Sequence, residues 1–135
     1  MEISMPTSFT AFCASRFETY VRYATLRLRD KDLARQTAQE AFGDLAMVWA
    51  EALESSSPSA LAWRLLAART NRAAGNHDPV LYRVLPREQA DAVLLKYCLG
   101  LPAAQAAEVL GWTSVRFDWA LHEAMRTART GEALG

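Results

Sequence analysis

The stretch Leu101–Arg129, LPAAQAAEVLGWTSVRFDWALHEAMRTAR, decides the fold. Pro102 predicts the start of a short helix over Ala103–Leu110, since proline suits the first turn of a helix. Gly111 predicts its end, because glycine readily takes the left-handed conformation that stops a helix. A longer helix is then expected over Ser114–Arg129. Two helices joined by a short glycine-containing turn are the helix-turn-helix arrangement, whose second helix enters the major groove in DNA-binding proteins.

The rest of the chain also has helical periodicity. Apolar residues recur every three to four positions, and no strand-like alternation extends beyond a few residues. We expect helices over Thr10–Leu28 and Leu33–Leu53, from Leu61 to just before Gly75, and from Pro86 to Gly100. Asp32 is expected to cap the second of these helices, because a carboxylate can accept the unpaired N–H groups of a first turn. The predicted fold class is therefore all-α.

A polar stretch divides the chain. Asn76-His77-Asp78-Pro79 disfavours helix continuation, so we place a short linker at residues 76–84. The expected architecture is two small helical domains, with an N-terminal helical bundle at residues 1–75 and a C-terminal helix-turn-helix domain at residues 85–135.

Composition sets limits on the environment and on the partners. The 15 Lys and Arg residues balance 15 Asp and Glu residues among 135, which excludes the chain-wide basic field of a strong, non-specific nucleic-acid binder. Cys13 and Cys98 fit no metal-ligand spacing, and we expect two reduced, buried thiols. No signal peptide is recognisable, and no apolar run reaches the ~18–20 residues of a membrane span. A soluble, cytoplasmic protein without membrane contact is expected.

Two stretches, taken together, resemble the extracytoplasmic-function (ECF) sigma factors of bacterial RNA polymerase. Residues 32–42, DLARQTAQEAF, are similar to the family pattern A-x-D-x-x-Q-E-x-F, and a Trp63-containing helix follows. Residues 85–112, LPREQADAVLLKYCLGLPAAQAAEVLGW, are similar to its C-terminal helix-turn-helix pattern, L-P-x-x-x-R-x-x-x-L-x-Y-x-x-G-L-s-x-x-E-I-A-x-x-L-G. The resemblance covers most of Phe9–Ala128. It implies one domain that binds the polymerase clamp and melts the minus-ten element, and one that reads the minus-thirty-five element.

The resemblance assigns roles to particular residues. Gln39 and Glu40 would contact the polymerase, although chemistry alone favours a solvated polar pair on an amphipathic helix. The remaining candidates for DNA contact on the last helix are Arg116, His122, Arg126 and Arg129. The core-facing positions expected on that helix are Phe117, Leu121, Ala124 and Ala128.

The chain also departs from the family pattern. Asp118, Ala120 and Glu123 stand where the family favours Lys or Arg, and a carboxylate directed at a phosphate is repelled. From residue 76 onward six basic residues face seven acidic ones, so the expected DNA-reading domain has no basic excess. Trp112 and Trp119 flank the start of the last helix, either as partly buried packing or as a protein-binding patch.

Three functional interpretations remain open. The first is an ECF sigma-factor-like transcription regulator that associates with the RNA polymerase core and promoter DNA. The second is a degenerate sigma-like protein that no longer reads promoters and binds a regulatory protein or a second copy of itself. The third is a general helix-turn-helix regulator whose N-terminal helices only dimerise. We expect no enzyme, catalytic residues, metal or cofactor, since no phosphate loop, nucleophile motif or ligand cluster is present.

Overall fold

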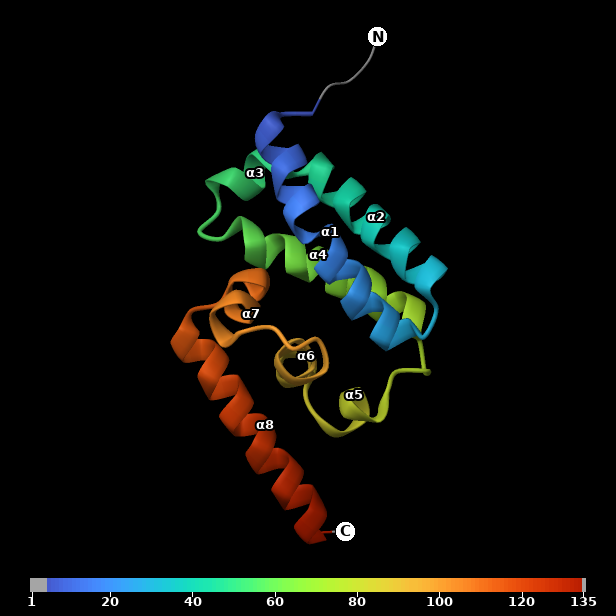
Figure 1. Ribbon diagram of the computed structural model, residues 1–135, viewed down its shortest axis with the longest axis vertical. Coiled ribbons are helices and arrows are strands. Elements are labelled where there is room, and N and C mark those ends of the chain that lie inside the picture. Colours follow the sequence, from blue (N-terminus) through green and yellow to red (C-terminus); the bar gives the residue numbers. More distant parts are fainter. Residues whose placement is uncertain (1–4, 135) are drawn as a thin grey trace. The chain divides into compact units, whose positions relative to one another are not determined.

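Helices account for all the regular secondary structure in residues 5–134, the part of the chain that the computed structural model describes, with side chains described through Thr130 (Figure 1). The predicted all-α fold class is therefore confirmed for these residues. The chain forms two compact units that divide between Ala74 and Gly75. The first unit contains α1 (Thr7–Leu28), α2 (Lys31–Met47), α3 (Trp49–Glu54) and α4 (Pro58–Ala74). The second contains α5 (Val80–Val84), α6 (Arg87–Val93), the π-helix η1 (Leu94–Cys98), α7 (Ala103–Leu110) and α8 (Ser114–Leu134).

The turn between α1 and α2 is built by two residues. Arg29 ends α1 in the left-handed conformation, with φ 56°, and its N–H donates to the Thr25 carbonyl. Asp30 is extended, and its side chain accepts a hydrogen bond from the Leu33 N–H at 3.0 Å. The expectation that Asp32 caps this helix is therefore wrong, because the helix begins at Lys31 and Asp32 already lies in its first turn.

The single helix expected over Leu33–Leu53 is interrupted. Val48 leaves the helical conformation, with φ −123° and ψ 19°, and separates α2 from α3. The break accompanies the burial of Trp49, whose indole ring lies 5.4 Å from both Phe9 and Phe12 of α1, centroid to centroid. The sequence prediction failed here because this contact joins residues about 40 positions apart.

Helices α1, α2 and α4 pack together in the first unit (Figure 1). Aromatic rings fill the core between them. Tyr20 stacks on Phe42 of α2 at 5.3 Å and meets Trp63 of α4 edge-on at 5.7 Å. Tyr23 lies 4.5 Å from the same indole, and Leu66 is fully buried beside these helices. Rings from three helices thus hold the unit together through large buried areas and directed ring contacts.

Part of the expected linker at residues 76–84 is a helix. Val80–Val84 forms the short α5, which packs on α6 and α8. Tyr82 of α5 is buried, and its hydroxyl donates a hydrogen bond to the Asp91 carboxylate of α6 at 2.5 Å. The assignment of the whole segment as linker is therefore corrected. The prolines at its two ends limit the helix length, and the buried tyrosine anchors it.

Two glycines lie just after helices of the second unit, Gly100 after η1 and Gly111 after α7. Gly100 and Gly111 have φ of +73° and +75°, a conformation that suits glycine, and α7 has the bounds predicted for it. Before them, α6 widens into η1, where the Leu99 N–H reaches back to the Leu94 carbonyl. The last helix extends beyond the expected end at Arg129, as far as Leu134.

Two burial predictions are wrong. Cys98 is exposed at the end of η1, while Cys13 is half-buried, and both are free thiols. Burial raises the pKa of the Cys13 thiol, which keeps it protonated at neutral pH. Ala128 is exposed rather than core-facing, because the buried side of α8 ends near Ala124.

Candidate functional site

The N-terminal half of α8 is fixed between α6 and α7. The Thr113 hydroxyl accepts a hydrogen bond from the Arg116 N–H at 3.1 Å, which satisfies one unpaired donor of the first turn. Phe117, Ala120 and Ala124 are buried on one side of the helix. The opposite side is therefore directed at solvent, because residues three and four apart share a side of a helix.

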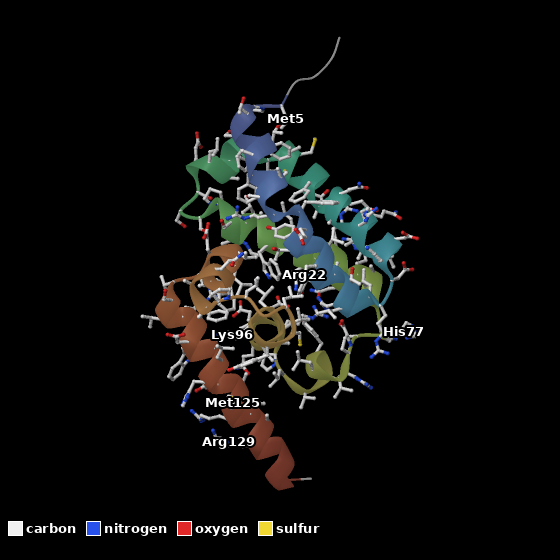
Figure 2. The ribbon with its side chains drawn as sticks, in the orientation of Figure 1. Met5, Arg22, His77, Lys96, Met125 and Arg129 are labelled. Atoms are coloured by element: carbon white, nitrogen blue, oxygen red, sulfur yellow. The ribbon has the colours of Figure 1, made fainter. Side chains whose placement is uncertain are left out.

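We call this opposite side the outer face of α8. It consists of seven exposed residues: Val115, Asp118, Trp119, His122, Met125, Arg126 and Arg129. Figure 2 shows Met125 and Arg129 along this helix. Three large apolar side chains on the face are strongly exposed: Val115 at 79%, Trp119 at 61% and Met125 at 51%. The outer face thus combines apolar surface with cationic groups.

The positions at which basic residues would be expected from the family pattern behave differently from one another. Ala120 is buried, so it is a core position and not a lost DNA contact. The Glu123 side chain is only 24% exposed. Its carboxylate forms an ion pair with Arg126 and accepts a hydrogen bond from that guanidinium at 2.9 Å. Asp118 alone of these three residues belongs to the outer face. Of the three residues that replace expected basic residues, only Asp118 therefore lowers the positive charge of the outer face.

The cations predicted to contact DNA are not equally available. Arg116 pairs with Glu88 of α6 at 3.2 Å, and its guanidinium lies 4.3 Å from the centre of the half-buried Trp112 ring. This contact holds Arg116 beside α6 and away from the outer face. Arg126 is exposed but shared with Glu123. Arg129 is exposed, and no ion pair joins it to another side chain within the part of the chain described to Thr130.

Trp119 lies at the centre of the N-terminal half of the outer face. Its ring is 6.4 Å from the His122 imidazole, centroid to centroid, and tilted by 34°. Of the two tryptophans predicted for a protein interface, Trp119 is the exposed one, while Trp112 packs under Arg116. An exposed indole offers a large apolar surface with one hydrogen-bond donor, which suits contact with a macromolecule.

No family model, curated protein or solved structure matches the chain.

The second candidate region is the solvent side of α2. Gln39 is exposed, whereas the neighbouring Glu40 belongs to a cluster of four side chains that we call the Arg69 cluster: Gln36, Glu40, Asp44 and Arg69. The structure therefore separates the two residues predicted to contact the polymerase. Gln39 is directed at solvent, and Glu40 is engaged within the unit.

The geometry of the Arg69 cluster is bidentate. Arg69 of α4 donates to both carboxylate oxygens of Asp44, at 2.7 and 2.8 Å, and to Glu40 at 2.7 Å. Gln36 donates to the other oxygen of Glu40 at 2.9 Å. The hydrogen bonds from Arg69 hold the pKa of the Asp44 carboxyl below its usual value. The sequence did not predict this cluster, because Arg69 lies 25 residues from Asp44 and 29 residues from Glu40 along the chain.

The described residues include neither a candidate metal site nor a helix suited to a membrane. No group of three or more His, Cys, Asp or Glu side chains is placed to hold a metal ion in the described part of the chain. None of the described helices has both the length and the apolar character needed to cross a membrane.

Proposed function

We propose that the chain is an ECF sigma-factor-like transcription regulator that binds the RNA polymerase core and approaches promoter DNA through α8. The observation that carries the proposal is the order of α7, a three-residue turn from Gly111 to Thr113, and α8 with a solvent-exposed outer face. This is the arrangement that a helix-turn-helix reader requires, because its second helix must be open to the major groove.

The first unit supports the same proposal. In the proposed architecture it is the N-terminal helical bundle, and the unit 75–135 is the helix-turn-helix domain. Gln39 projects from α2 as an exposed side chain, while the Arg69 cluster fixes α2 against α4. Gln39 would thus contact the polymerase from α2, while Glu40 helps to hold that helix through its ion pair with Arg69.

The charge of the outer face predicts DNA binding that is weak and has only a modest salt dependence. Arg126 and Arg129 are its only arginines, and Asp118 opposes them. Each phosphate contact contributes a slope of about −0.9 to the dependence of log K on log salt concentration. Two contacts therefore give a slope of about −2, shallow for a specific DNA-binding protein. Promoter binding would depend on the polymerase for most of its affinity.

A second candidate function is supported by the exposed apolar side chains of the same face. A sigma-like protein that acts through protein–protein contacts, without reading promoters, would use Trp119 as the centre of its interface. Trp is over-represented among the residues that dominate binding energy at interfaces. The 61% exposure of Trp119 specifically favours this alternative.

Retention of promoter-containing DNA fragments at low salt, by the chain alone and with core polymerase, distinguishes the two functions. The sigma-like function predicts retention in the presence of core polymerase and its loss at high salt. If core polymerase with the chain retains no fragment, promoter recognition is contradicted and the second candidate remains.

Charge substitutions sharpen this test. Asp118→Lys replaces the carboxylate of the outer face with a cation and should strengthen DNA retention, with a steeper salt dependence, because it adds a phosphate contact. Glu123→Arg should add less, because that side chain is only 24% exposed and lies off the outer face. Glu54→Lys at the end of α3 is the matched control, since it makes the same charge reversal as Asp118→Lys at an exposed position away from α8. An equal gain from Glu54→Lys would show that net charge, and not the face of α8, governs retention.

A further inference from the structure

We propose that two copies of the chain associate through the outer face of α8, with the two helices antiparallel about a two-fold axis. The dimer itself does not require the DNA-reading role. Its regulatory consequence rests on the proposed function, since the dimer would cover the face that approaches DNA.

Apolar exposure is the first argument. Val115, Trp119 and Met125 expose more than half of their surface on one side of one helix. Single exposed apolar residues are ordinary, but a group of three on one face marks a contact surface. Covering an indole and a thioether removes apolar area from water, which favours association.

Charge complementarity identifies the occupant as a second copy. Asp118 and Arg129 are eleven residues apart, about three turns of helix, so they lie on the same side of α8. A two-fold axis perpendicular to two antiparallel helices places the same face of each helix against the other, and the residues of the two faces run in opposite directions. The carboxylate of each copy then faces the guanidinium of the other, twice. A parallel pair would instead set like charges against each other.

The side chains between these charges also complement one another. Residues His122, Met125, Arg126 and Arg129 have the i, i+3, i+4, i+7 spacing of a hole on a helix surface. With the two-fold axis near Glu123, about midway between Asp118 and Arg129, Trp119 of one copy enters this hole on the other. The indole would then contact a thioether and two guanidinium groups, both favourable neighbours of an aromatic ring.

The size of the face predicts a weak dimer. Residues 114–130 form a strip of about 25 Å by about 10 Å. This strip is well below the roughly 800 Å² per partner of a standard stable interface. Association should therefore depend on concentration, with monomers at high dilution and dimers at high concentration.

Sedimentation equilibrium of the purified full chain over a wide range of concentrations tests the proposal. We expect a monomer–dimer equilibrium, weakened at least tenfold by Trp119→Ala. Met47→Ala, which removes an equally apolar side chain that is 85% exposed on α2, is the matched control and should leave the equilibrium unchanged.

The antiparallel register has its own test. Asp118→Arg should weaken association by placing like charges together, and the double variant Asp118→Arg with Arg129→Asp should restore it. A chain that stays monomeric at the highest attainable concentration, or a dimer indifferent to Trp119→Ala, would overturn the proposal. Failure of the double variant to restore association would overturn the antiparallel pairing. A monomeric chain that still retains DNA with core polymerase would refute the dimer and leave the proposed function standing.

Discussion

Aromatic side chains occupy different places in the two units of the chain. In the first unit all eight are buried or half-buried, and their rings contact one another: Phe9, Phe12, Phe17, Tyr20, Tyr23, Phe42, Trp49 and Trp63. In the second unit Phe117 and Tyr82 are buried and Trp112 is half-buried, but Tyr97 and Trp119 are exposed.

The difference indicates that the aromatic rings of the first unit stabilise its fold, whereas the exposed rings of the second unit are free to bind a partner. The first unit uses its rings to join α1, α2 and α4, so their loss should unfold it. The core of the second unit consists mainly of Leu and Ala side chains around Phe117, such as Leu95, Ala106 and Leu110. Its remaining aromatic surface is therefore available to a partner, and α8 carries the largest exposed ring.

Deleting one indole from each unit gives the largest contrast. Trp63→Ala should cost about 3–5 kcal/mol of unfolding free energy, because it leaves a cavity among packed rings. Trp119→Ala should change it by less than about 0.5 kcal/mol, since the side chain is 61% exposed. Denaturant unfolding at high dilution measures both. Similar losses from the two substitutions would contradict the division between the units.

Buried tyrosine hydroxyls provide a second contrast. Tyr82→Phe removes a hydrogen bond to the buried carboxylate of Asp91 and should cost about 1–3 kcal/mol of unfolding free energy. Tyr20→Phe in the first unit should be neutral or slightly stabilising, because its buried hydroxyl has no hydrogen-bond partner among the described residues. The exposed Tyr97→Phe is the control and should have no effect in the same unfolding experiment.

Acid titration of the Arg69 cluster gives a smaller effect, confined to the first unit. Because Arg69 lowers the pKa of Asp44 in the folded state, this pair stabilises the fold fully above the unfolded pKa of about 3.9. The contribution is lost as pH falls below that value through the lower folded pKa. The thermal midpoint of the parent chain should therefore fall more between neutral and strongly acidic pH than that of Arg69→Met. Exposed Arg64→Met on the same helix should behave like the parent; an equal change in all three would remove the pair as the cause.

Local signals predicted the ends of several helices. Pro102 and Gly111 fix the bounds of α7 through their own backbone preferences, which need no distant contact. Long-range contacts explain the failures. The break at Val48 depends on where Trp49 packs, and the short α5 depends on a tyrosine that finds its carboxylate on α6.

The candidate site was predicted in part. The core-facing positions predicted on the last helix did not include Trp119, and the structure exposes this residue. Sequence alone did not reveal that Ala120 is a core residue, that Glu88 holds Arg116, or that Arg69 engages Glu40. Each of these facts depends on a neighbouring helix that periodicity within one helix does not identify.

Binding of the purified full chain to bacterial core RNA polymerase tests the central claim most directly. We expect a one-to-one complex by light scattering, weakened by Gln39→Ala on the solvent side of α2 and unchanged by the exposed control Met47→Ala on the same helix. A chain that forms no complex with core polymerase, even at low salt, would contradict the sigma-like function.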